Sequence, residues 1–174
     1  MPIIGTKYRL FIFVVESNPD CVARLMQGLE VPEQSLIKAF SSGESFIDFF
    51  PKSKIPKRKL ILIFLGYTFS DEANHNLMNG IEILETVKML NPAVHVVMLT
   101  HNGEQEYGGH AKSMGANSCI MKDESMVIRA NSLIRLLLSE KKLGNRRRQL
   151  KVAAVSWLVA LVCFLLSVGV CCFS

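Results

Sequence analysis

Short apolar runs alternate with helical patterns along the first 140 residues, and this alternation constrains the fold more than any other feature. Five runs of branched and aromatic residues are typical of buried strands: Leu10–Val15, Ser35–Phe40, Leu60–Leu65, Val94–Leu99 and Ser118–Met121. Parallel strands need crossover connections, and these are usually helices that cover both faces of a sheet. The sequence therefore predicts an α/β fold, with a doubly wound five-stranded parallel sheet.

The segments between these runs carry helix signals. Asn18 and Pro19 suit the cap and the first position of a helix. The predicted later helices are Gly43–Phe50, ending before Pro51; Asn79–Leu90, which is amphipathic; Gln105–Met114, weakened by two glycines; and Ser125–Ser139. Each strand run is thus followed by a helix, as a doubly wound sheet requires.

The C-terminal segment is apolar on every side. Residues 152–173 are 22 residues without Asp, Glu, Lys or Arg. As a helix they would span roughly 33 Å, enough for a hydrocarbon core of about 30 Å. Trp157 lies near the charged end, where an interfacial indole is expected. We expect a C-terminal transmembrane helix; the alternative is a fully buried helix, or a tail buried in an oligomer.

The positive charge of the chain is local. The net charge is +5, yet residues 1–140 hold 14 basic and 15 acidic residues. The other six cations precede the apolar segment: Lys141, Lys142, Arg146, Arg147, Arg148 and Lys151. This distribution argues against a nucleic-acid partner.

Cations beside a membrane span usually stay in the cytoplasm, so Arg146, Arg147, Arg148 and Lys151 would orient the chain. The sequence predicts a globular domain over 7–140, a basic linker over 141–151 and a span over 152–173. The predicted location is the inner (cytoplasmic) membrane, as a single-pass protein with the N-terminal domain in the cytoplasm.

In open parallel sheets the functional crevice lies beyond the carboxyl ends of the strands. These ends present Glu16-Ser17, Gly66-Tyr67, Thr100-His101 and Lys122-Asp123.

Four segments in order resemble the receiver domain of response regulators. VVESNP (14–19) is similar to the acidic turn of that family, and MNGIEIL (78–84) to its MDGxEL segment. VVMLT (96–100) is similar to the family strand that ends in Ser or Thr, and GANSCIMK (115–122) to GAxDYxxK. The resemblance implies a flavodoxin-like fold and a signalling role, not an enzyme.

The resemblance also implies a site. In the family, two acidic residues after the first strand and an Asp after the third bind Mg²⁺, and that Asp accepts a phosphoryl group. A Ser or Thr after the fourth strand and a Lys after the fifth contact the phosphoryl oxygens. Glu16, Thr100 and Lys122 match such positions.

Other family positions carry different residues. Ser17 stands at the second acidic position and Cys119 at that of the switch aromatic. Gly66 stands at the phosphoacceptor position, with Phe64 as the alternative if the strand is shifted. With one carboxylate of three, no cofactor is expected, and Mg²⁺ binding should be very weak or absent.

These residues predict a degenerate receiver in which Lys122 pairs with Glu16 as a structural salt bridge. The expected function is a membrane-anchored, phosphorylation-independent interaction module in bacterial signalling, whose partner is another signalling protein. A homodimer through the span stays open. The alternative is a working phosphorelay regulator in which Asp71, in the polar loop after Gly66, is the acceptor.

Overall fold

The structure of the protein is a computed structural model that describes residues 9–53, 55–56, 59–69, 78–101, 105–144 and 157, with the backbone alone at 105–107. The chain divides into two compact units, Met1–Asn131 and Ser132–Ser174. They are described separately.

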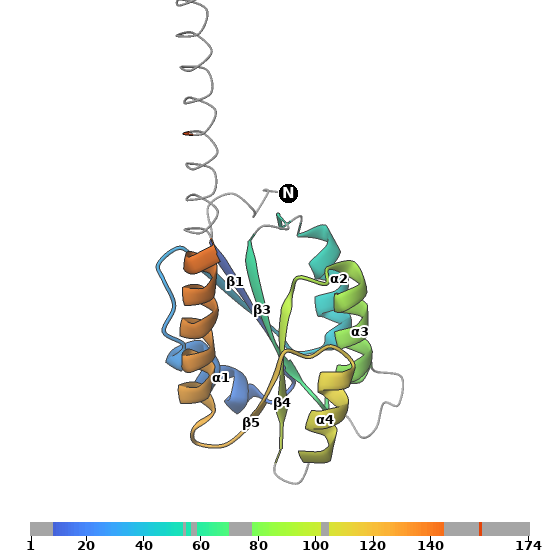
Figure 1. The fold of residues 1–174 in the computed structure, drawn as a ribbon. Coiled ribbons are helices and arrows are strands. Elements are labelled where there is room, and N and C mark those ends of the chain that lie inside the picture. Colours follow the sequence, from blue (N-terminus) through green and yellow to red (C-terminus); the bar gives the residue numbers. More distant parts are fainter. Residues whose placement is uncertain are drawn as a thin grey trace, which may run out of the picture. The chain divides into compact units, whose positions relative to one another are not determined.

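The first unit contains one five-stranded sheet (Figure 1). Its strands are β1 (Leu10–Val15), β2 (Ser35–Phe40), β3 (Leu60–Gly66), β4 (His95–Thr100) and β5 (Ser118–Met121). Their order is β2-β1-β3-β4-β5, and every neighbouring pair is parallel. The predicted doubly wound parallel sheet is thereby confirmed.

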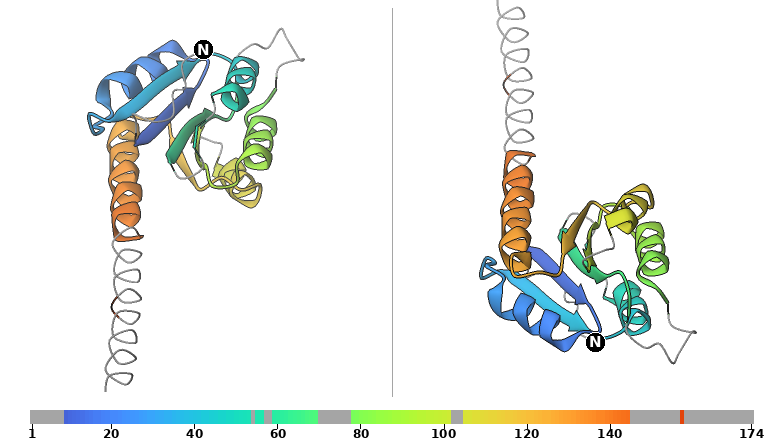
Figure 2. Two further views of the ribbon diagram at one scale, coloured as in Figure 1. Left: turned by 90° about the horizontal axis from the view of Figure 1, so that it is seen from above. Right: turned by 90° about the horizontal axis from the view of Figure 1, so that it is seen from below.

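Helices cover both faces of the sheet. They are α1 (Pro19–Gly28), α2 (Gly43–Lys52), α3 (Gly80–Leu90) and α4 (Gln105–Ser113). Figure 2 shows α1 on one face and α2, α3 and α4 on the other. The helical residues 126–131 pack on the same side as α1, since Cys21 Sγ lies 3.6 Å from Met126 Sδ.

Local sequence explains where these helices begin. The Asn18 side chain accepts hydrogen bonds from the backbone N–H groups of Asp20 and Cys21, and Pro19 occupies the first helical position. Asn79 caps α3 in the same way, and Glu82 completes a capping box.

The prediction that the second helix ends before Pro51 is wrong. α2 continues to Lys52 with Pro51 inside it. A proline removes only its own N–H bond, and here this falls in the last turn, where Ser53 N still donates to the carbonyls of Phe49 and Phe50. The hydrogen bonds from Ser53 N therefore complete the last turn of α2.

The core is densest where α2 meets the sheet. All residues of β1 and β3 are buried, as expected for strands covered on both faces. Phe13 of β1 contacts the rings of Phe46 and Phe50, with centroids 5.5 and 6.1 Å apart. This packing holds the central strands, whose carboxyl ends carry the site, in register with Val15 opposite Leu65.

In the second unit, residues 132–144 are helical, so the last helix reaches beyond its predicted end at Ser139. No helix among the described residues has both the length and the apolar character needed to cross a membrane. The predicted span over 152–173 lies outside the described residues except for Trp157, as do Arg146, Arg147, Arg148 and Lys151.

Candidate functional site

The carboxyl edge of the sheet brings together residues that the sequence places far apart. Glu16 follows β1, Gly66 ends β3, Thr100 ends β4 and Lys122 follows β5. Lys122 N donates to the Thr100 carbonyl at 2.8 Å. This hydrogen bond fixes the Lys122 backbone beside the end of β4, and from there the side chain extends to Glu16.

Glu16 and Lys122 form a buried ion pair. Lys122 Nζ lies 2.7 Å from Glu16 Oε2, and the two side chains are only 5 % and 1 % exposed, respectively. Glu16 Oε1 accepts a hydrogen bond from Asn18 N at 3.0 Å. Glu16 Oε2 and Lys122 Nζ have no conventional hydrogen bond to any described residue, so each is the other's electrostatic partner. The predicted structural salt bridge is confirmed.

Gly66 lies directly against this pair. A Cβ atom on Gly66 would sit 2.6 Å from Glu16 Oε2 and 3.2 Å from Glu16 Cδ. Real Cβ atoms do not approach other atoms so closely, so the Glu16 carboxylate occupies the space a side chain at position 66 would need. Phe64, the alternative position, is fully buried within β3.

The first residue of α3, Gly80, packs closely against the end of β3 at the same edge. A Cβ atom on Gly80 would lie 2.3 Å from the Gly66 carbonyl oxygen and 2.8 Å from that of Tyr67. Gly80 N donates to the Tyr67 carbonyl at 3.1 Å. Only a glycine allows this approach, and this gives the glycine of the MNGIEIL segment a packing role.

The remaining predicted positions carry little charge. Ser17 is half-buried beside Glu16, and Thr100 is 7 % exposed. Cys119 on β5 is half-buried, and its thiol donates to the Gly108 carbonyl at 3.5 Å. Burial raises the pKa of the Cys119 thiol, which keeps it protonated at neutral pH.

Two arginines hold the loop after β5. Arg24 Nη2 donates to the Asp123 carbonyl at 2.6 Å, and Arg129 Nη2 donates to the Met121 carbonyl at 3.0 Å and also pairs with the Asp123 carboxylate. The hydrogen bond from Arg129 lowers the pKa of Asp123. The contact of Arg24 with Asp123 could not be found from the sequence, because the two residues are 99 positions apart and no spacing connects them.

The donor set does not fit Mg²⁺. This ion needs several oxygen ligands, mainly carboxylates and waters. Glu16 is the sole carboxylate among the candidate positions, and its two oxygens already face Lys122 and the Asn18 N–H. Within the described part of the chain, no three His, Cys, Asp or Glu side chains are grouped closely enough to hold a metal.

Comparison with known families identifies the class of protein. The profile of the response regulator receiver domain matches residues 12–129. The chain therefore belongs to the receiver domain family of two-component signal transduction, whose members are signalling modules and not enzymes in the usual sense. No curated protein matches the chain significantly.

Solved structures share the fold. The signal receiver domain of a protein described as a Luxo repressor from Vibrio parahaemolyticus is 21 % identical with a TM-score of 0.62, over 79 % of this chain and 95 % of that one. A CheY-like receiver from Methanospirillum hungatei is 19 % identical with a TM-score of 0.60, over 77 % and 97 %. NtrX from Brucella abortus is 21 % identical with a TM-score of 0.61, over 80 % of this chain, which spans only 29 % of NtrX.

Proposed function

We propose that this receiver is a membrane-anchored interaction module that binds another signalling protein without accepting a phosphoryl group. Phosphoryl transfer to a receiver needs an in-line carboxylate nucleophile and positive charge to stabilise the transferred group. We assign Gly66 to the position of that nucleophile, and Glu16, Ser17, Thr100 and Lys122 to the remnant of the pocket around it.

One observation carries the proposal: the Glu16 carboxylate occupies the space beside Gly66. A side chain at position 66 would begin 2.6 Å from Glu16 Oε2. Lys122, whose charge would otherwise be available to a phosphoryl oxygen, is instead bound to Glu16 at 2.7 Å. Position 66 thus carries no nucleophile, the Glu16 carboxylate lies beside it, and the Lys122 cation is paired.

The contacts of the loop after β5 support a binding role that needs no conformational switch. Arg24 and Arg129 bind backbone carbonyls on either side of Lys122. Cys119, at the position of the switch aromatic, is a small thiol bound to the Gly108 carbonyl. A surface held in this way presents one conformation to a partner.

The experiment exposes the full-length chain to acetyl phosphate and Mg²⁺ and measures the intact mass. We expect no phosphoryl adduct. A stoichiometric, base-labile adduct would contradict the proposal, and the Asp71→Asn variant would then show whether Asp71 is the acceptor, as in a working regulator.

The anchoring part of the proposal rests on the sequence. Residues 152–173 lack Asp, Glu, Lys and Arg and follow the cations Arg146, Arg147, Arg148 and Lys151. We propose that this segment spans the inner membrane, with the receiver domain in the cytoplasm.

Alkaline carbonate extraction tests the anchor. The full-length chain should stay in the membrane pellet. A variant with Leu165→Arg and Leu166→Arg places two charges near the middle of the segment and should move to the supernatant, because charges at the bilayer centre are costly. Extraction of the unmodified chain would contradict the anchor.

A further inference from the structure

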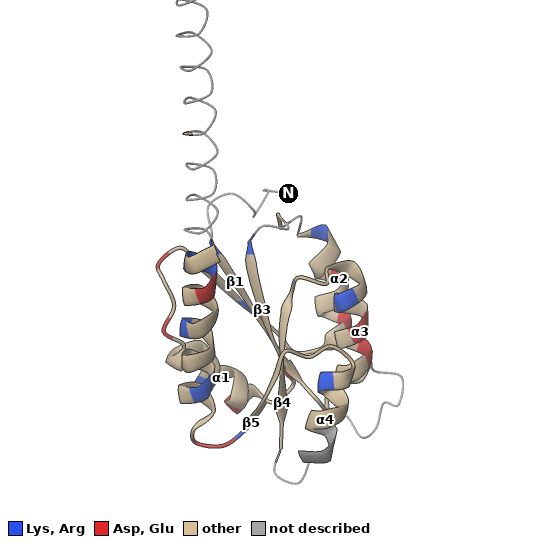
Figure 3. Cartoon of the chain, viewed as in Figure 1, with Lys and Arg blue, Asp and Glu red and all other residues tan. Residues whose placement is uncertain are grey.

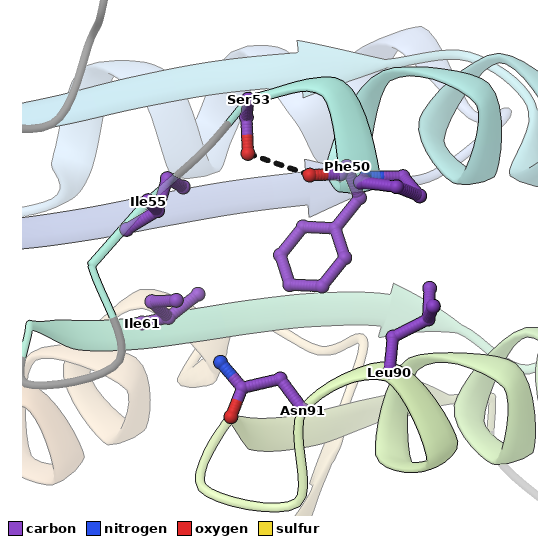
Figure 4. A pocket seen from close by; sticks show the side chains of 7 residues that line it. Phe50, Ser53, Ile55, Ile61, Leu90 and Asn91 are labelled. Atoms are coloured by element: carbon purple, nitrogen blue, oxygen red, sulfur yellow. Dashed lines mark hydrogen bonds between the residues drawn. The ribbon is translucent and has the colours of Figure 1, made fainter.

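A hollow lies at the opposite edge of the sheet, where the strands begin. It has a volume of about 270 Å³ and lies between the end of α2, the start of β3 and the end of α3 (Figure 4). It is lined by Phe50, Pro51, Ser53, Ile55, Ile61, Leu90 and Asn91. The Ser53 hydroxyl is already bound to the Phe50 carbonyl, so the walls are mainly apolar.

Two consecutive apolar side chains are exposed at the end of α3, and the second of them, Leu90, lines the hollow. Met89 is 85 % exposed and Leu90 is 46 % exposed at the end of α3. Burying apolar side chains is favourable, so adjacent exposed ones that adjoin an apolar hollow indicate a surface that something covers. We call Met89, Leu90 and the lining of the hollow the amino-edge surface.

Cations surround the amino-edge surface. Lys52 ends α2 between two lining residues and is 64 % exposed, and Lys59 directly precedes β3. Figure 3 shows basic residues at the end of α2 and at the start of β3. Lys52 pairs with Asp48, but both side chains are largely exposed and such pairs contribute little, so Lys52 can exchange its partner. In the sequence, residues 52–59 hold five cations and no acid.

We propose that the amino-edge surface binds an anionic lipid bilayer. Met89 and Leu90 would enter the boundary between headgroups and acyl chains, and Lys52 and Lys59 would lie among anionic headgroups. Long lysine side chains suit this arrangement because their stems cover apolar surface while their charges reach the headgroups.

A membrane fits this surface better than a protein partner for two reasons. The exposed apolar residues are few, and the adjoining segment 52–59 holds five cations and no acid, a combination typical of interfacial membrane contacts. The inference also rests on the proposed anchor, because a tethered domain meets the bilayer at a high effective concentration and a weak contact is then sufficient.

The test uses the full-length chain reconstituted in phosphatidylcholine vesicles, with or without phosphatidylglycerol. Trp157→Phe removes the native tryptophan, and Met89→Trp then places one reporter on the amino-edge surface. Ile128→Trp in the same background is the matched control, since Ile128 is 69 % exposed but follows β5 at the other edge of the sheet.

We expect lipids with brominated acyl chains to remove most of the emission of the Met89→Trp reporter in phosphatidylglycerol vesicles, and little of that of the control. Adding Lys52→Gln and Lys59→Gln, or raising the salt concentration, should restore the emission because both weaken the attraction to anionic headgroups.

Vesicle flotation separates the two proposals. If the chain floats with vesicles but Met89→Trp is quenched no more than Ile128→Trp, the bilayer contact is wrong and the anchor stands. If the chain does not float, the anchor is wrong and this inference falls with it. A reporter that shifts to shorter wavelength without quenching by brominated lipid would indicate a second copy or another protein on the surface, and would also overturn the proposal.

Discussion

The two edges of the sheet differ in what they bury: the carboxyl edge buries charged side chains, whereas the amino edge leaves apolar side chains exposed. At the carboxyl edge, Glu16 and Lys122 bury charge against Gly66, and the Glu16 carboxylate occupies the space beside that glycine. At the amino edge, Met89 and Leu90 leave apolar surface exposed beside an open hollow. In receiver domains the chemistry belongs to the carboxyl edge, and here the Glu16–Lys122 pair lies there beside Gly66.

This difference predicts how each edge of the sheet responds to substitution. A lysine without a counter-charge in a buried pocket would be costly, and Glu16 supplies that charge. The amino edge has no comparable internal partner for Met89, which is 85 % exposed. The carboxyl edge should therefore be sensitive to substitution and the amino edge tolerant, and four measurements test this contrast.

The largest effect is expected from breaking the buried ion pair. Lys122→Met leaves the Glu16 carboxylate buried without its cation, which should lower the free energy of unfolding by about 3–5 kcal/mol. Denaturant unfolding of the detergent-solubilised chain measures it. The control is Glu16→Gln with Lys122→Met, which removes both charges and keeps an acceptor for Asn18 N, and should recover most of the loss. A single variant as stable as the unmodified chain would show that the pair is not buried.

Close packing at the carboxyl edge is tested by Gly80→Ala. Its Cβ would lie 2.3 Å from the Gly66 carbonyl oxygen, a backbone atom that cannot rotate away. We expect a loss of about 3 kcal/mol in unfolding free energy. Gly109→Ala is the matched control, since a Cβ there meets nothing within 4 Å. It should stabilise the helix by about 0.4–1 kcal/mol, and equal effects at the two sites would contradict the contrast.

At the amino edge, Met89→Ser should change the unfolding free energy by no more than about 0.5 kcal/mol in detergent, because the side chain is exposed and forms no core contact. A loss comparable to that of Gly80→Ala would mean that Met89 is buried, and the amino-edge surface would then not exist as described.

The smallest effect concerns pH. Arg129 lowers the pKa of Asp123 in the folded protein below the ordinary value of 3.8. The stability that the ionised Asp123 contributes is therefore fully present above this value and is lost as the pH falls through the lowered pKa. Asp123→Asn lacks this contribution, so the two proteins should differ slightly at neutral pH and converge in acid. A difference that grows in acid would contradict the sign.

Much of the fold was predictable because strand and helix patterns are local. The apolar runs located all five strands to within about one residue, and Asn18 and Asn79 located the starts of two helices. The end of α2 was missed because Pro51 falls in the last turn, where a proline costs little. The last helix runs past its predicted end at Ser139 because no glycine or proline follows before Gly144.

The candidate site was predictable only in part. Strand ends in a parallel sheet share one edge, so Glu16 and Lys122 could be expected to meet. The sequence does not reveal that the Glu16 carboxylate fills the space beside Gly66, or that Gly80 touches the Gly66 carbonyl. These are contacts between atoms of separate strands and helices, and they depend on packing.

By itself, the sequence determined the class of fold, the receiver resemblance, the missing carboxylates and the distribution of charge, because each depends on residue identity and local spacing. Tertiary structure alone decided that the carboxyl edge is closed by an ion pair and that Met89 and Leu90 stay exposed beside a hollow. The physical reason is that burial and close approach are set by which elements pack together, and residues far apart in the chain supply the atoms on both sides of each contact.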